Sequence, residues 1–191
     1  MSNSVISKNF NSKGDFIMRN KSEHKPDTLE VLRDAIIIRK KLTKMLCVIT
    51  VQKGREHELL DKELATLQDK VEIEAKAKEI SEKAFEFEML KKDFDIINKT
   101  SHEITGNLRN ANTIWPEYMA EFTARRVFLD NAIGACWVLI DELQYIAETV
   151  YADMNKFTAL ALDIDELLQK IKKLRQADNR FLKELKDFRD F

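Results

Sequence analysis

Apolar residues recur at helical spacing along most of the chain. They lie three or four residues apart over residues 31–49, 129–150 and 157–174. Because an α-helix turns once in 3.6 residues, this spacing places them along one face. Residues 60–71 carry a heptad-like spacing typical of coiled coils. The pattern predicts an all-α protein, an antiparallel helical bundle built from long helix hairpins and partly coiled-coil-like.

Glycine and proline mark the expected helix boundaries. The whole chain has four Gly and two Pro, so there are few places for turns. We expect Gly54 to end the first helix, residues 98–106 to interrupt the second, and Pro116 to begin the third. Asp27 and Glu30 have the spacing of a capping box at the start of the first helix.

These boundaries predict three segments. Residues 1–26 are rich in Ser, Asn and Lys, and we expect a flexible N-terminal arm. Residues 27–98 are expected to form a long helical hairpin, and residues 99–191 the core of the bundle. Within this core, the helix from residue 116 to about 151 has apolar residues on two faces, which predicts the most buried helix.

Asp178 falls on the apolar seam of the last helix. An acid in that position has two interpretations, and the sequence does not decide between them. The helix leaves the bundle there, or the carboxylate pairs with a cation such as Arg125 or Arg126.

The charge is balanced overall but unevenly distributed. The net charge is −1, yet residues 31–55 contain seven basic residues and one acid, and residues 56–103 contain fourteen acids and eight bases. Either the two helices attract each other, or the first helix carries a phosphate-binding face. The candidate contacts to nucleic acid or to a partner protein are Arg39, Lys40, Lys41 and Lys44. No aromatic residue is interleaved with them, so base stacking is unsupported.

Sequence signatures of catalysis and of cofactor binding are missing. There is no Gly-rich phosphate loop and no helical Glu-x-x-His pair for a di-metal site. Cys47 and Cys136 fall on apolar faces, and we expect both to be buried, reduced thiols. The sequence therefore predicts no enzyme, no catalytic residue, no metal, no cofactor and no small-molecule substrate.

Hydropathy predicts a soluble, cytoplasmic protein that does not act at a membrane. The longest apolar run, residues 132–140, has nine residues, whereas a membrane span needs about 20. The N-terminus lacks the apolar stretch of a signal peptide.

A protein partner and self-association are expected from the apolar stripes, which exceed what one thin bundle needs. Trp115, Arg125 and Arg126 combine residue types that are favoured at protein interfaces. The candidate interface residues are Trp115, Leu129, Ile133, Cys136 and Ile140.

Part of the chain resembles a known family. Residues 124–129 with Gly134, and the stripe 160–167 leading to residues 173–175, are similar to the Avd-type four-helix-bundle accessory proteins of diversity-generating retroelements. The resemblance covers at most residues 90–191. It implies a small bundle that assembles into a ring, binds a reverse transcriptase and contacts template RNA or DNA, with Arg125 and Arg126 as candidate polar contacts.

Two functions of different class are therefore predicted. The first is a non-enzymatic helical scaffold or adaptor that self-associates and acts through helix–helix contacts. The alternative is a nucleic-acid-associated accessory protein of a mobile element, with a reverse transcriptase as its partner.

Overall fold

The computed structural model describes residues 30–149, 154–183 and 185, and the predicted N-terminal arm and the cap at Asp27 lie outside them. The described residues form helices and short connections, with no strand among them. The predicted all-α class is confirmed. The elements are α1 (Glu30–Thr66), α2 (Lys70–Thr113), α3 (Met119–Thr149), α4 (Met154–Ala177) and a 3-10 turn, η3 (Asp178–Lys183).

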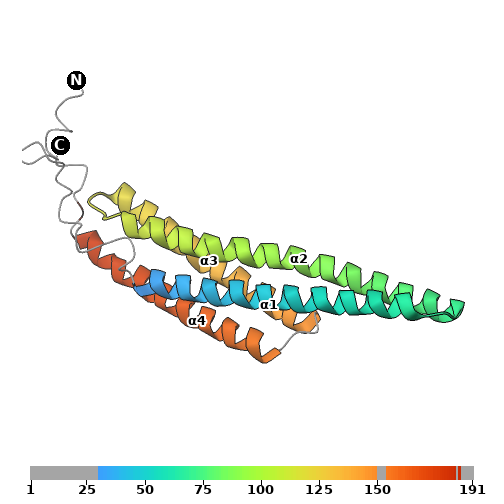
Figure 1. Cartoon of the computed structure of the whole chain (residues 1–191). Helices are drawn as coiled ribbons and strands as arrows, with labels where there is room; N and C mark the ends of the chain where they lie inside the picture. Colours follow the sequence, from blue (N-terminus) through green and yellow to red (C-terminus); the bar gives the residue numbers. More distant parts are fainter. Residues whose placement is uncertain (1–29, 150–153, 184, 186–191) are drawn as a thin grey trace, which may run out of the picture.

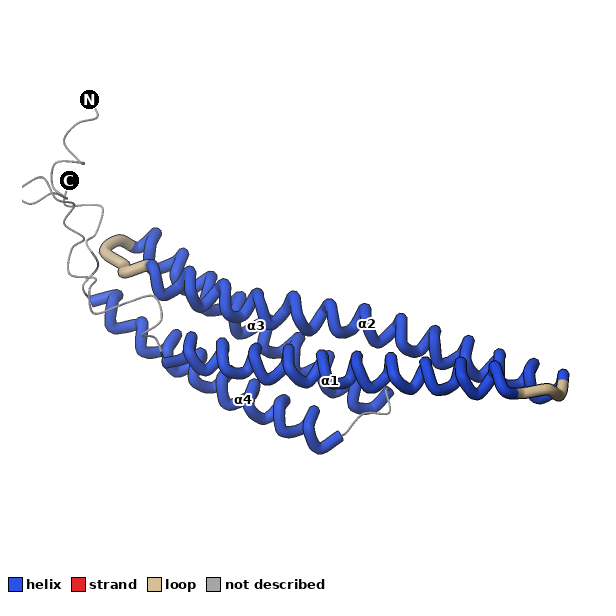
Figure 2. Tube along the Cα trace, in the orientation of Figure 1, coloured by secondary structure: helices blue, strands red, loops and turns tan. Residues whose placement is uncertain are grey.

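The helices are arranged as an antiparallel bundle with a projecting arm. Each helix packs against two neighbours: α1 and α3 both contact α2 and α4. Figure 1 shows that α1 and α2 continue together past the ends of α3 and α4. With 44 residues, α2 is about 66 Å long at 1.5 Å per residue. We call the part of α1 and α2 from about residue 56 to residue 83 the arm; its tip is the tan loop at the right end of Figure 2.

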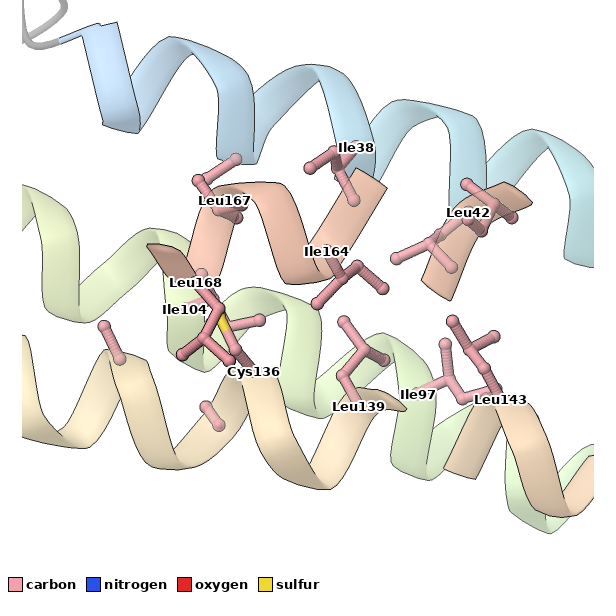
Figure 3. Packing of buried hydrophobic residues seen from close by; sticks show 14 of the residues in the cluster. Ile38, Leu42, Ile97, Ile104, Cys136, Leu139, Leu143, Ile164, Leu167 and Leu168 are labelled. Atoms are coloured by element: carbon pink, nitrogen blue, oxygen red, sulfur yellow. The ribbon is translucent and has the colours of Figure 1, made fainter. Parts of the chain in front are cut away.

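All four helices contribute side chains to one hydrophobic core. Leu42 of α1, Ile97 of α2, Leu139 of α3 and Ile164 of α4 are at most 1% exposed and lie together in Figure 3. Burying a large apolar side chain contributes about 1.5–3 kcal/mol, so this cluster supplies most of the stability. The core includes residues on both sides of the predicted boundary at residue 98, which falls inside α2.

The predicted break at Gly54 is wrong, because α1 continues through it to Thr66. One glycine inside a helix costs about 1 kcal/mol relative to alanine. Packing of the buried Leu60 and ion pairs between the arm helices offset that cost.

The predicted interruption at residues 98–106 is also wrong, since α2 runs without a break to Thr113. Polar residues of this stretch bond to the helix itself: Ser101 donates to the carbonyl of Asn98 at 2.8 Å, and Thr105 donates to that of His102 at 3.0 Å. Burial of Ile104 against the other helices then outweighs the cost of Gly106.

The turn of the hairpin lies at residues 67–69 instead. Asp69 caps α2, and its carboxylate accepts hydrogen bonds from the backbone N–H groups of Val71 and Glu72 at 2.8 and 3.1 Å. Asp69 and Glu72 have the same three-residue capping spacing that predicted a helix start at Asp27. The signal for this turn was therefore present in the sequence.

Candidate interaction surfaces

The side chains of the predicted basic cluster of α1 point in three different directions. Arg39 turns toward α2, where it contacts the ring of His102 and the hydroxyl of Thr105. Lys41 turns toward α4 and pairs with Asp163 at 2.6 Å. Lys40 and Lys44 point away from the bundle and are exposed.

The outer face of α1 forms a strip that is both basic and apolar. Lys40 and Lys44 share this face with Arg33 and Arg55 because the four cations are separated by 7, 4 and 11 residues, close to whole helical turns. None of the four has a hydrogen-bonding or ion-pairing partner among the described residues, and no exposed residue from 33 to 55 is acidic. We define the basic strip as Arg33, Ile37, Lys40, Lys44, Val48, Val51 and Arg55, all exposed.

Cys47 lies beside this strip and is exposed, so its predicted burial is wrong. The apolar stretch around it, residues 45–51, wraps around more than one face of α1, and only part of it faces the core. Cys136 is fully buried as predicted, and burial raises the pKa of its thiol to about 12.

Arg125 is buried and does not form a surface with Arg126. Its Nε donates to Asp178 at 2.6 Å, and its Nη1 donates to the carbonyls of Ala111 and Ile114. Of the two interpretations of Asp178, the pairing with a cation is confirmed. The α-helix ends before Asp178, but the chain does not leave the bundle there, because Phe181 of η3 is buried. Because its donors are used inside the fold, Arg125 is not available to nucleic acid in this structure.

Arg126 and Trp115 lie near the same end of the bundle. Arg126 is half-buried, with its guanidinium 5.3 Å from the centre of the Phe122 ring and 2.7 Å from the side-chain oxygen of Asn179. The Trp115 ring meets Phe181 edge-on, with centroids 5.0 Å apart, and 42% of the residue remains exposed.

The other predicted interface residues face the interior of the bundle. Leu129 and Cys136 have no exposed surface, and Ile133 and Ile140 are partly buried against the same core. The stripe that suggested an interface with another protein packs α3 within its own chain. Of these predicted residues, Trp115 alone remains exposed.

A second exposed surface, not singled out from the sequence, lies where α2 and α3 pack together. Met89 and Tyr145 line one cavity at this junction. Ile96 lies seven residues after Met89, and Val138 lies seven before Tyr145, so both pairs continue along the antiparallel helices on the same side. We define the α2–α3 strip as Phe85, Met89, Ile96, Val138 and Tyr145, which are 40–68% exposed.

The surroundings of the α2–α3 strip are mainly acidic. From residue 127 to residue 149, α3 contains four acids and no lysine or arginine. Glu103 lies seven residues beyond Ile96, Asp141 lies between Val138 and Tyr145, and neither acid pairs with a described residue. Lys92 and Lys99 are the exposed cations on this side of α2.

Alternating charges replace apolar residues where the arm leaves the bundle. Ile97, Leu90, Lys83 and Lys76 follow one another at seven-residue steps on α2, so the core face becomes cationic in the arm. Salt bridges of 2.7–3.4 Å join six side chains into an ion ladder, in the order Lys53, Glu56, Lys83, Glu79, Lys76 and Glu63.

The ion ladder differs from the predicted attraction between a basic first helix and an acidic second one. Its links between the helices place the cations on α2 and the acids on α1, because α1 continues into residues 56–66. The hydrogen bond from Lys83 lowers the pKa of Glu56, and the one to Glu63 raises the pKa of Lys76. The ladder covers the face on which another helix would have to pack, so the arm extends beyond the bundle as a two-helix structure.

The described residues contain no group of three or more His, Cys, Asp or Glu side chains placed to hold a metal ion. Within the same residues, no helix combines the length and the apolar character needed to cross a membrane. Comparisons of the chain with protein-family models, with curated proteins and with solved structures give no significant match.

Proposed function

We propose that this protein is a non-enzymatic helical scaffold that self-associates, with the basic strip of one copy docking on the α2–α3 strip of another. The observation that carries the proposal is the complementary character of these two surfaces. Both have exposed apolar residues at helical spacing, one is flanked by cations without described partners, and the other lies among acids.

Charge and apolar area act together in such a contact. The apolar side chains gain about 25 cal/mol for each Å² that is removed from water. The opposite charges direct the two surfaces toward each other and disfavour other pairings. From Arg33 to Arg55 the basic strip extends about 33 Å along α1, which suits a helix-to-helix contact.

The contact would join two different surfaces of the same chain. Such a heterologous interface leaves one free surface of each kind on a dimer, so assembly continues until it closes or forms a filament. A scaffold of this kind acts by setting the spacing of the projecting arms, which the ion ladder keeps clear of a third helix.

The test measures mass by sedimentation velocity over a range of protein concentrations at low salt. We expect a concentration-dependent assembly that the double change Lys40→Glu/Lys44→Glu weakens at least tenfold. The matched control, Lys70→Glu/Lys173→Glu, reverses two exposed lysines away from both strips and should assemble as the unchanged protein does. A monomer at every concentration would exclude the proposal.

A mixing experiment tests which surfaces meet. The change Glu103→Lys/Asp141→Lys reverses the charge beside the α2–α3 strip and should also prevent assembly. An equimolar mixture of the two reversed proteins should assemble, because each reversed surface then meets its complement. If both proteins still assemble alone, or if the mixture does not, the two strips are not the interface.

Nucleic-acid binding is the second candidate, and the four cations of the basic strip favour it. They lie on one face with no exposed acid between residues 33 and 55, which suits contact with a phosphate backbone. Arg125 contributes nothing to this candidate, since its donors are used inside the fold.

The binding of a labelled RNA and of a DNA duplex, followed by fluorescence anisotropy, separates the two candidates. Four phosphate contacts would give a slope of about −3 to −4 in a plot of log K against log salt concentration. Lys40→Glu/Lys44→Glu should then abolish binding, and Lys70→Glu/Lys173→Glu should not. No binding at 50 mM salt would leave self-association as the function of this face.

A further inference from the structure

A cavity of about 360 Å³ lies where the arm leaves the bundle. Residues from α1 and α2 form most of its wall, and Tyr145 and Thr149 close it near the end of α3. Its size falls at the lower end of the range of small-molecule sites, about 300–1,000 Å³. The cavity lies between the bundle core and the arm, and Lys53, Glu56 and Lys83 of the ion ladder form part of its wall.

The wall is largely apolar and aromatic. Leu60 and Leu90 are at most 7% exposed and Phe87 is half-buried. Phe85 and Tyr145 line the cavity with more than half of their surface exposed. An unoccupied cavity therefore leaves aromatic surface in contact with water, and a ligand with an apolar body would cover it.

The cations of the cavity wall are already neutralised. Lys53 and Lys83 both donate to the carboxylate of Glu56, at 3.2 and 3.0 Å, and Lys83 also pairs with Glu79 at 3.4 Å. All four side chains belong to the ion ladder, so an anionic ligand would have to displace Glu56 from two lysines.

The remaining acids of the wall are not neutralised. Glu86 and Asp93 line the same cavity, and neither forms an ion pair or a hydrogen bond with a described residue. Burial raises the pKa of Asp93 and outweighs the opposite effect of the Lys92 charge, so the negative charge of Asp93 is poorly solvated there. A positive charge placed in the cavity would relieve this cost.

We propose that the cavity binds an organic monocation with an apolar body, such as an arylalkyl amine or a quaternary ammonium ion. The apolar body lies against Leu60, Phe87 and Leu90, and the positive charge lies near Asp93 and Glu86. The rings of Phe85 and Tyr145 add cation–π attraction, which is about 0.5–1 kcal/mol at exposed positions and more when the cation is desolvated. The cavity shares Phe85, Met89 and Tyr145 with the α2–α3 strip, so a bound cation and a docked second copy would compete for this surface. The charged residues of the two proposals differ.

The test compares three probes that share one apolar body and differ in charge. They are 3-phenylpropyltrimethylammonium, the neutral 3-phenylpropan-1-ol and the anionic 3-phenylpropane-1-sulfonate, titrated calorimetrically into the full chain. We expect the cation to bind at least tenfold more tightly than the alcohol, and the sulfonate not to bind. Equal binding of all three probes, or no binding of the cation, would overturn the proposal.

Variants locate the site. Glu86→Gln/Asp93→Asn should weaken binding of the cation at least tenfold and leave binding of the alcohol unchanged. The matched control, Asp95→Asn/Glu103→Gln, removes two exposed acids of α2 outside the cavity and should bind the cation as the unchanged protein does. Equal weakening by both pairs would show general attraction to an acidic surface and would exclude the cavity as the site.

The titrations are made at a protein concentration where sedimentation gives a single species. Thermal melting of each variant checks that it is folded. A third variant, Leu90→Met, keeps the core filled and changes the shape of the wall, so it should alter the affinity for the cation and for the alcohol by the same factor. Unchanged affinity for both would place the ligand elsewhere.

Discussion

Arg125 and Asp178 lie 53 residues apart in the sequence and form a buried ion pair at one end of the bundle. The side chains are 8% and 1% exposed, and two hydrogen bonds join them, Nε to Oδ2 at 2.6 Å and Nη2 to Oδ1 at 3.3 Å. Arg125 also donates to two carbonyls at the end of α2. One side chain of α3 therefore holds the ends of α2 and α4 together.

Removing one partner of this pair should destabilise the protein strongly. Arg125→Met leaves a buried carboxylate without its cation, and we expect a loss of about 3–5 kcal/mol in the free energy of unfolding. Urea denaturation followed by circular dichroism measures it. The double change Arg125→Met/Asp178→Leu should recover part of the loss, because no buried charge remains.

Arg126→Met is the matched control for this prediction. Arg126 is half-buried and bonds to the exposed Asn179, so its loss should change stability by less than about 1 kcal/mol. If the double variant is less stable than Arg125→Met alone, the carboxylate of Asp178 does not destabilise the fold without its cation, and the buried charge is not the cause of the loss.

The ion ladder should make the stability of the arm depend on pH in a defined direction. Lysine neighbours lower the pKa of Glu56 below its ordinary 4.5, so this acid stabilises the fold above pH 4.5, and the effect disappears as the pH falls through the lowered value. Glu56 raises the pKa of Lys83 above 10.5, and that contribution disappears as the pH rises through the raised value.

Thermal melts of the unchanged protein and of Glu56→Gln test this prediction. The variant should melt at a lower temperature at pH 7 and low salt, and the difference should shrink toward pH 3 and in 1 M NaCl. Glu58→Gln changes a neighbouring exposed acid outside the ladder and should have little effect. A difference that persists at pH 3 would mean that packing, not charge, is lost.

How much of this fold the sequence predicts depends on the kind of signal. Apolar periodicity gave the helical class because burying a face outweighs other local preferences. It placed Leu129 and Cys136 on an apolar face but did not show which neighbour covers that face, since a helix of the same chain and a partner protein need the same pattern. The breaks predicted at Gly54 and around Gly106 are wrong because one residue of low helix propensity does not end a helix whose turns are packed on both sides.

The charged surfaces were only partly predictable for a related reason. The sequence shows that α1 contains a run of basic residues, but the turn of the helix directs Arg39 toward α2 and Lys41 toward α4. Projecting residues 33–55 onto a helix would have separated these from Lys40 and Lys44. The α2–α3 strip combines residues about 50 positions apart and requires the pairing of two helices to be known.

The two cysteines should differ sharply in reactivity. Cys47 is exposed, whereas burial raises the pKa of the Cys136 thiol to about 12, so that roughly one Cys136 in ten thousand is a thiolate at pH 8. A colorimetric disulfide reagent should therefore modify one thiol rapidly in the folded protein and a second after unfolding. In Cys47→Ser the rapid phase should disappear; rapid reaction of Cys136 would show that the core opens readily.

Alanine at two glycines tests whether the long helices are continuous in solution. A Cβ at Gly54 or Gly106 meets no atom within 4 Å, and both positions lie inside helices. Each change should therefore stabilise the protein, by about 0.5–1 kcal/mol, because alanine has the higher helix propensity. Urea denaturation measures the effect of Gly106→Ala on the bundle, and hydrogen exchange of the arm measures that of Gly54→Ala.

The sign of the change in stability at each glycine distinguishes a continuous helix from a broken one. If α1 ended at Gly54, the glycine would adopt the left-handed backbone conformation common after a helix, and alanine would be destabilising there. A break at Gly106 in α2 would likewise make alanine destabilising there. Stabilisation at both positions would mean that the arm forms from uninterrupted helices, as the ion ladder requires, since its links join residues on both sides of Gly54. Destabilisation at Gly54 would indicate that the hairpin turns at that residue and that the ion ladder does not form.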